Sequence, residues 1–203
     1  MTNINALTLE VPDISAAEVF YDKAFGLGDR LRFRAAEAPS QGFRAFVISL
    51  VVADPTVADS FLGPAIDAGA TVLKPAKKSF WGYGGVVQAP DGAIWKVASS
   101  SKKPTGAPAR TVDDLVLLLG VDDVAATKRF YADHGFTVGK SYGRKYVEFE
   151  SGPDAVKLAL YGRKAAAKDA GVDAAGSGSH RLVIGGDAGQ FSDPDGFMWS
   201  ADT

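Results

Sequence analysis

The stretch APDGAIWK, residues 89–96, has a counterpart near the end of the chain in DPDGFMWS, residues 193–200. In each copy Pro-Asp-Gly predicts a tight turn, because Pro fixes φ, Asp bonds to nearby backbone and Gly accepts a positive φ. The residues around each Trp predict the strand that follows the turn. A Phe-Tyr pair, Phe20-Tyr21 or Phe130-Tyr131, precedes each copy at a similar distance. The pattern therefore indicates two versions of one design.

Length and composition limit the classes of protein to consider. A chain of 203 residues, 46% hydrophobic and 23% charged, has room for two globular repeats of about 100 residues each. The absence of Cys agrees with a reducing compartment and removes thiol chemistry. No apolar run is long enough to span a membrane, and the first residues lack a signal-peptide pattern. We therefore expect a cytoplasmic protein with no membrane partner.

The charge distribution argues against a nucleic-acid partner. The formal net charge is −2, and apart from a small basic cluster within residues 101–110 the Lys and Arg residues are scattered along the chain. A protein that binds phosphate backbones needs a basic face. We therefore expect no nucleic acid among the partners.

Hydrophobic periodicity predicts similar elements in both halves. The expected strands are 5–11, 31–33, 43–52, 71–73, 84–88 and 93–98, then 114–121, 146–149, 156–161 and 181–184. Helices are expected after a cap at Asp13 or Ser15, after Asp54, and over residues 122–134 and 164–170. Residues 74–80 and 176–178 are expected in loops. The polar, Pro-bearing residues 100–111 predict a linker between one repeat at 1–99 and another at 112–203.

The ordered set of motifs resembles the glyoxalase and bleomycin-resistance group, which is the vicinal oxygen chelate superfamily. The set comprises Val-Pro-Asp at residues 11–13, a helix that carries Phe-Tyr, AGATVLKP at 68–75, Phe-Trp-Gly at 80–82, and Pro-Asp-Gly before a Trp-bearing strand. The resemblance covers nearly the whole chain apart from the linker. It implies an α+β fold of tandem βαβββ repeats whose curled mixed sheets surround a cleft.

The resemblance also implies where a metal ion would be bound. Enzymes of this superfamily commonly hold a divalent metal with a His or Gln on the first strand, a further His, and a Glu after the Pro-Asp-Gly turn. The first-strand positions here are Ala6 and Val116, and the Glu positions are Lys96 and Ser200. An ammonium group repels a cation and Ser is a poor isolated ligand. We therefore expect no metal and no other cofactor, and the sequence identifies no catalytic residue.

Eight residues are candidates for contact with a ligand: Glu10, Phe80, Trp81, Tyr83, Lys96, Tyr146, Lys157 and Tyr161. Most of them lie on the face of their strand that alternates with the apolar face. For Glu10 and Lys96 this alternation predicts either that both side chains point into one cleft or that they form an exposed pair at the end of a sheet. The segment 80–83 is flanked by Gly and does not fit a plain core strand. Aromatic side chains with polar tips suit a small aromatic ligand, and equally suit the outer face of a sheet. Trp95 and Trp199 lie on the apolar phase, which predicts core positions.

These observations favour a metal-independent protein that binds a small molecule, of the type that sequesters a compound and confers resistance to it. The expected ligand is aromatic or anionic. One alternative is a lyase, isomerase or dioxygenase with a metal site that the motifs do not reveal, and another is an interaction module without a ligand. The sequence leaves open whether there is catalysis, whether there are one or two clefts, and whether the protein is a monomer or a homodimer.

Overall fold

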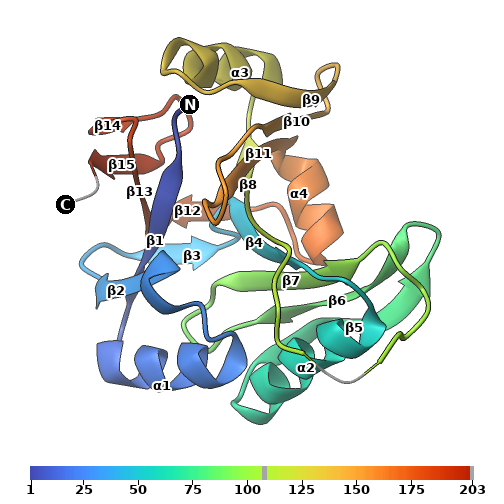
Figure 1. The fold of residues 1–203 in the computed structure, drawn as a ribbon. Helices are drawn as coiled ribbons and strands as arrows, with labels where there is room; N and C mark the ends of the chain where they lie inside the picture. The colour runs from blue at the N-terminus through green and yellow to red at the C-terminus, as the bar shows by residue number, and fades with distance from the viewer. Residues whose placement is uncertain (107–108, 202–203) are drawn as a thin grey trace.

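The structure is a computed structural model that describes residues 1–106 and 109–201. Residues 107–108 of the predicted linker and residues 202–203 of the second repeat lie outside the described residues. The predicted α+β class is confirmed, because two large sheets and four α-helices make up the fold (Figure 1).

A five-stranded sheet joins the beginning of the chain to its end (Figure 1). Its order is β14-β15-β13-β1-β2, and it comprises β1 (Ile4–Val11), β2 (Leu31–Ala35), β13 (Leu182–Gly186), β14 (Phe191–Ser192) and β15 (Met198–Ala201). β1 pairs in antiparallel orientation with β13 and in parallel orientation with β2. The two ends of the chain therefore depend on each other for this sheet.

The middle of the chain forms an eight-stranded sheet in the order β5-β6-β7-β4-β8-β11-β10-β9. Its strands are β4 (Phe46–Val51), β5 (Thr71–Ser79), β6 (Gly82–Gln88), β7 (Ile94–Ser99), β8 (Asp114–Val121), β9 (Val138–Tyr142), β10 (Tyr146–Phe149) and β11 (Lys157–Gly162). The two halves meet at its centre, where β4 pairs with β8. Neither half of the sequence therefore builds a sheet of its own.

The helices differ in how they begin. They are α1 (Ile14–Ala24), α2 (Pro55–Asp67), α3 (Val124–Asp133) and α4 (Arg163–Ala170), with a short 3₁₀ helix at Gly28–Arg30. Asp13, Asp54 and Asp123 cap the first three with side-chain oxygens that accept backbone N–H groups, as is usual for a helix N-cap. Gly162 precedes α4 and gives it no side-chain cap. None of the helices in the described part of the chain is long and apolar enough to cross a membrane.

The repeated Phe-Tyr and Trp motifs form two equivalent clusters in the core. Trp95 Nε1 donates to the Tyr21 hydroxyl at 3.3 Å, and that hydroxyl donates to Asp91 at 2.7 Å. In the second copy, Trp199 Nε1 donates to the Tyr131 hydroxyl at 3.2 Å, and that hydroxyl donates to Asp193. Both indoles are fully buried, so the prediction that the two Trp residues are core anchors is confirmed.

Some predicted loops are strands. Residues 74–79 continue β5, and residues 176–178 form β12 (Gly176–Gly178), which pairs with β3 (Ser40–Gly42). β5 is the outermost strand of its sheet and pairs only with β6, so Pro75 and exposed Lys residues are tolerated there. β9, which was not predicted, is also an outermost strand and carries mostly exposed residues.

Candidate functional site

The two predicted metal positions of the eight-stranded sheet lie in one row across it. Lys96 on β7 lies opposite Ser49 on β4, Ser49 lies opposite Val116 on β8, and Val116 lies opposite Lys157 on β11. The alternate residues of these strands, including Trp95, pack into the core with α2 and α3 on the other face. The row therefore lies on the inner face of the curled sheet.

This inner face already contains a helix. The sheet curls around α4, which packs on β8, β11 and β4 (Figure 1). Ala166 and Ala167, together with Ala170, belong to one buried cluster with Val47, Leu118 and Ala159 of the sheet. Small residues permit this close approach: a Cβ on Gly120 would lie 3.2 Å from the Ala166 Cβ. The centre of the face is therefore filled by a segment of the second half.

Two lysines of the first half bind the C-terminal end of α4. Lys96 Nζ forms an ion pair with Asp169 Oδ2 at 2.7 Å. Lys74 Nζ donates to the backbone carbonyls of Lys168 at 2.8 Å and Asp169 at 2.6 Å. Cations are favoured at this end of a helix because the helix dipole is negative there. Where the resemblance places a metal-binding carboxylate, the structure places an ammonium group and its carboxylate partner.

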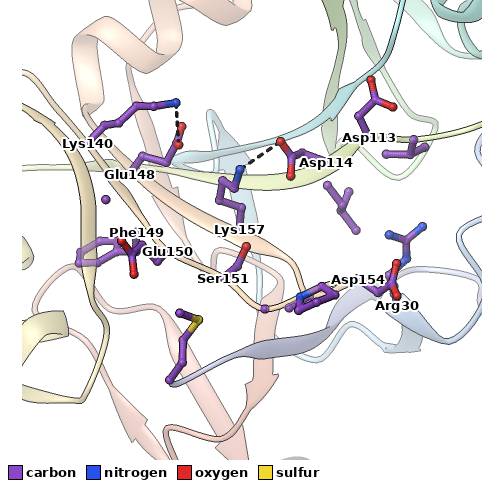
Figure 2. Close-up of a pocket in the computed structure, with 17 residues that line it drawn as sticks. Arg30, Asp113, Asp114, Lys140, Glu148, Phe149, Glu150, Ser151, Asp154 and Lys157 are labelled. Atoms are coloured by element: carbon purple, nitrogen blue, oxygen red, sulfur yellow. Dashed lines mark hydrogen bonds and ion pairs between the residues drawn. The ribbon is translucent and has the colours of Figure 1, made fainter.

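One end of the inner face opens into a cavity of about 650 Å³, which we call the Asp114 cavity. Lys157 Nζ lies 3.0 Å from Asp114, and Lys140 Nζ lies 3.3 Å from Glu148 (Figure 2). The charged residues that line the cavity are Arg30, Asp113, Asp114, Lys140, Glu148, Glu150, Asp154 and Lys157. Carboxylates outnumber cations in this set, so the cavity is acidic and its lysines are largely neutralised.

The opposite end opens into a cavity of about 850 Å³, the Tyr161 cavity. It is bounded by the end of β11, the first turn of α4 and the turn between β9 and β10. Its charged lining residues are Asp122, Arg144, Lys145, Arg163, Lys164 and Asp173. Cations outnumber carboxylates here, so this cavity has a net positive charge, in contrast to the Asp114 cavity.

Tyr146 and Tyr161 lie opposite each other on β10 and β11, with ring centroids 5.9 Å apart in an edge-to-face arrangement. The Tyr146 hydroxyl donates to Glu148 at 3.0 Å. Burial raises the pKa of Tyr146, and the charge of Glu148 raises it further. Tyr146 therefore stays neutral and acts as a hydrogen-bond donor. The structure thus brings together two candidates predicted from the second half, Tyr146 and Tyr161, whereas Lys157 lines the Asp114 cavity at the other end of the face.

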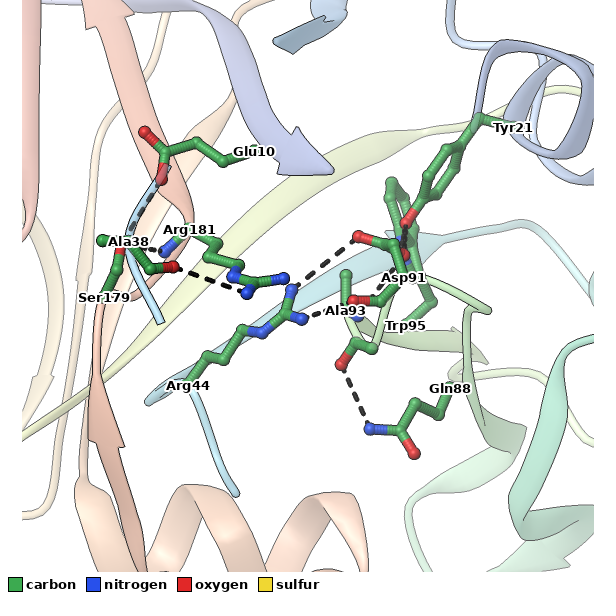
Figure 3. Close-up of polar contacts among 11 residues, drawn as sticks. Glu10, Tyr21, Ala38, Arg44, Gln88, Asp91, Ala93, Trp95, Ser179 and Arg181 are labelled. Atoms are coloured by element: carbon green, nitrogen blue, oxygen red, sulfur yellow. Dashed lines mark hydrogen bonds and ion pairs between the residues drawn. The ribbon is translucent and has the colours of Figure 1, made fainter. Parts of the chain in front are cut away.

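Glu10 lies elsewhere, on the five-stranded sheet. It forms an ion pair with Arg34. It also accepts a hydrogen bond from Ser179 at 3.3 Å (Figure 3). Lys96 belongs to the other sheet and has Asp169 as its partner. The expectation that Glu10 and Lys96 face one cleft is therefore wrong, because the two ends of the chain form a sheet separate from the middle.

The segment from Phe80 to Tyr83 lies at the connection between β5 and β6, and its residues line neither cavity. Phe80 and Trp81 are 82% and 83% exposed. The Tyr83 hydroxyl donates to Asp59 of α2 at 2.7 Å, and burial together with Asp59 raises the pKa of Tyr83 to about 12. A ligand role for these three residues stays a prediction, at a place distinct from the two cavities.

Both histidines are engaged by backbone carbonyls. His134 Nδ1 lies 2.8 Å from the Phe130 oxygen, and His180 lies between the carbonyl oxygens of Arg44 at 2.8 Å and Asp195 at 3.0 Å. Within residues 1–106 and 109–201, no group of three His, Asp or Glu side chains could hold a metal ion.

The two predicted metal positions of the five-stranded sheet, Ala6 and Ser200, both lie opposite Gly185.

Tandem βαβ-containing halves with a curled mixed sheet around an inner face define the vicinal oxygen chelate fold, and this chain has that fold. It is similar to glyoxalase I from Zea mays, with a TM-score of 0.61 and 14% identity over 98% of this chain and 91% of that chain. It is also similar to a proposed dioxygenase from Bacillus subtilis, with a TM-score of 0.57 and 12% identity over 95% of this chain and 71% of that chain. No protein-family model and no curated protein matches the sequence. These likenesses establish the fold.

Proposed function

We propose that the protein binds a small anionic molecule with a planar body in the Tyr161 cavity, without a metal ion, and thereby sequesters it. The observation that carries the proposal is a cavity of about 850 Å³ that has a Tyr ring in its wall and an excess of cationic side chains. Cavities of this size accommodate small organic ligands, with a few polar groups to fix their orientation.

Arg163 is the best-oriented of these cations. Its Nε donates to the Ala174 carbonyl at 3.0 Å and its Nη2 donates to the Phe43 carbonyl at 2.9 Å. Its guanidinium also lies over the Phe43 ring, with Cζ 5.7 Å from the ring centroid, which is within reach of a cation–π interaction. A side chain held in this way loses little entropy when a ligand binds. Arg144, Lys145 and Lys164 are exposed at the rim and would attract an anion from solution.

Metal independence is supported by the residues at the metal positions. Lys96 carries its positive charge where the superfamily places a carboxylate ligand, and it already has Asp169 as partner. Val116 offers no donor atom. The chemistry of this donor set does not fit a divalent cation.

The Asp114 cavity supports the second candidate, an enzyme whose metal site uses carboxylates. Asp114 and Glu148 both line this cavity, although each is paired with a lysine. Elemental analysis of the purified protein after dialysis separates the two candidates. One equivalent of a bound divalent metal that is lost from Asp114→Asn would favour the enzyme and contradict the proposal.

The test of the proposed function is a thermal-shift screen of aromatic carboxylates and phosphates, followed by calorimetric titration of the best compound. A charge-assisted hydrogen bond contributes about 1.5–3 kcal/mol, so Arg163→Ala or Tyr161→Ala should weaken binding roughly tenfold or more. Lys140→Ala, an exposed lysine of the other cavity, is the matched control and should leave the affinity unchanged. Equal loss in Lys140→Ala, or binding only in the presence of added metal, would contradict the proposal.

A further inference from the structure

We propose that Lys74 and Lys96 form a second binding site, for the acidic group of an apolar planar acid, and that the C-terminal turn of α4 is its internal occupant. The site goes beyond the proposed function, because it lies under α4 and not in the Tyr161 cavity. The ligand class is an aromatic or otherwise apolar molecule that carries a carboxylate, sulfonate or phosphate.

The end of α4 presents to the two lysines what such an acid would present. Lys96 Nζ lies 2.7 Å from a carboxylate oxygen of Asp169, and Lys74 Nζ lies 2.8 Å and 2.6 Å from two carbonyl oxygens. Three acceptor oxygens therefore converge on two ammonium groups. A bound carboxylate or sulfonate offers the negative charge that Asp169 supplies and further oxygens that can accept the hydrogen bonds now accepted by the two backbone carbonyls.

The floor beneath α4 is suited to an apolar body. The inner face there is formed by buried aliphatic side chains of five strands: Val47, Val86, Ile94, Leu118 and Ala159. α4 covers them with the methyl groups of its alanines alone, since its sequence RKAAAKDA contains no larger apolar residue. Removal of the helix would expose a continuous apolar surface, with the two lysines at its edge.

α4 is also the shortest α-helix in the described part of the chain. It has 8 residues and no side-chain N-cap, and a helix this short is not stable without tertiary contacts. The ion pair that holds its end is partly exposed, with 31% of the Lys96 side chain and 37% of the Asp169 side chain accessible. Exposed pairs of this kind are weakened by salt and contribute little to stability. An acid that binds Lys96 therefore competes with Asp169 for one charge. Its apparent affinity is reduced because only the molecules in which α4 is displaced can bind it.

The probe for this site is 8-anilinonaphthalene-1-sulfonate, an aromatic sulfonate whose fluorescence rises in apolar surroundings. The variant Asp169→Asn removes the internal anion and keeps the shape of the side chain. We expect it to bind the probe at least tenfold more tightly than the parent protein. The double variant Asp169→Asn with Lys96→Met should lose that gain, because the sulfonate then has no cation to replace Asp169.

A matched control is available on the same face. Asp114→Asn breaks the Lys157–Asp114 pair, which has a similar length of 3.0 Å but does not touch α4, so it should leave probe binding unchanged. Lys145 lines the Tyr161 cavity but is exposed and lies outside the buried cluster that contains α4. The gain from Asp169→Asn should therefore persist in a Lys145→Ala background, which separates this site from the Tyr161 cavity and from any failure of the proposed function. The proposal is overturned if Asp169→Asn binds no more tightly than the parent. It is equally overturned if the Lys96→Met double variant keeps the gain, because the probe would then report a loosened core without a specific anion site.

Discussion

Replacement of Trp95 by Ala should destabilise the protein severely. Trp95 is fully buried, its indole stacks on Phe25 with centroids 4.3 Å apart, and its Nε1 donates to Tyr21. Truncation of a buried Trp to Ala costs about 3–5 kcal/mol, because both the burial of apolar surface and the packing contacts of the indole are lost. For a chain of this length each kcal/mol lowers Tm by roughly 2–4 °C, so we expect a decrease of about 6–20 °C. Urea unfolding followed by circular dichroism gives the free energy directly.

The chain supplies its own control for this experiment. Trp81→Ala removes the same side chain at a position that is 83% exposed, so its effect should stay within about 0.5 kcal/mol. Trp199→Ala removes the equivalent indole of the second repeat and should behave like Trp95→Ala. If Trp95→Ala and Trp81→Ala unfold at the same urea concentration, the argument from burial is refuted.

Three further predictions concern hydrogen bonds and backbone geometry. Tyr131→Phe leaves the Trp199 indole and the buried Asp193 carboxylate without the shared hydroxyl, and should lower the free energy of unfolding by about 1–3 kcal/mol in urea. Backbone N–H groups at the start of α3 lower the pKa of Asp123. The stabilisation by this cap is therefore fully present above about pH 4 and is lost as the pH falls through the lowered pKa. The Tm of Asp123→Ala should accordingly lie below that of the parent at neutral pH and approach it in acid. Gly82→Ala should lower Tm clearly, because Gly82 has a φ of +139° and the added Cβ would lie 1.9 Å from a backbone oxygen. Gly143→Ala should have a smaller effect, because no atom lies within 4 Å of the added Cβ.

Local elements could be predicted from the sequence because local chemistry determines them. The Asp caps of α1 and α2 and the alternation around Trp95 were all identified and are present. β5 was predicted too short because Pro75 and its lysines are typical of loops, yet an outermost strand tolerates them.

The candidate site could be predicted only in part, for a physical reason. The polar phase of β10 and β11 correctly grouped Tyr146 with Tyr161, because strand alternation fixes which side chains share a face. The role of Asp169 was not predictable, since an Ala-rich helix has the same pattern whether it packs on a sheet face or lies at the surface. Glu10 was grouped with Lys96 because nothing local reveals that β1 pairs with β13.

The pairing of β1 with β13 has a consequence for the order in which the protein can fold during synthesis. β1 leaves the ribosome before the other strands of this fold, but its antiparallel partner is more than 170 residues later in the chain, Ile4 lying opposite Gly186. The strands of the eight-stranded sheet are all complete at Gly162, before β13 is made. Nascent chains should therefore acquire the eight-stranded sheet while β1 still has an unpaired edge, and such edges are where chains associate wrongly. Chaperone demand during translation should fall only when the last strands emerge.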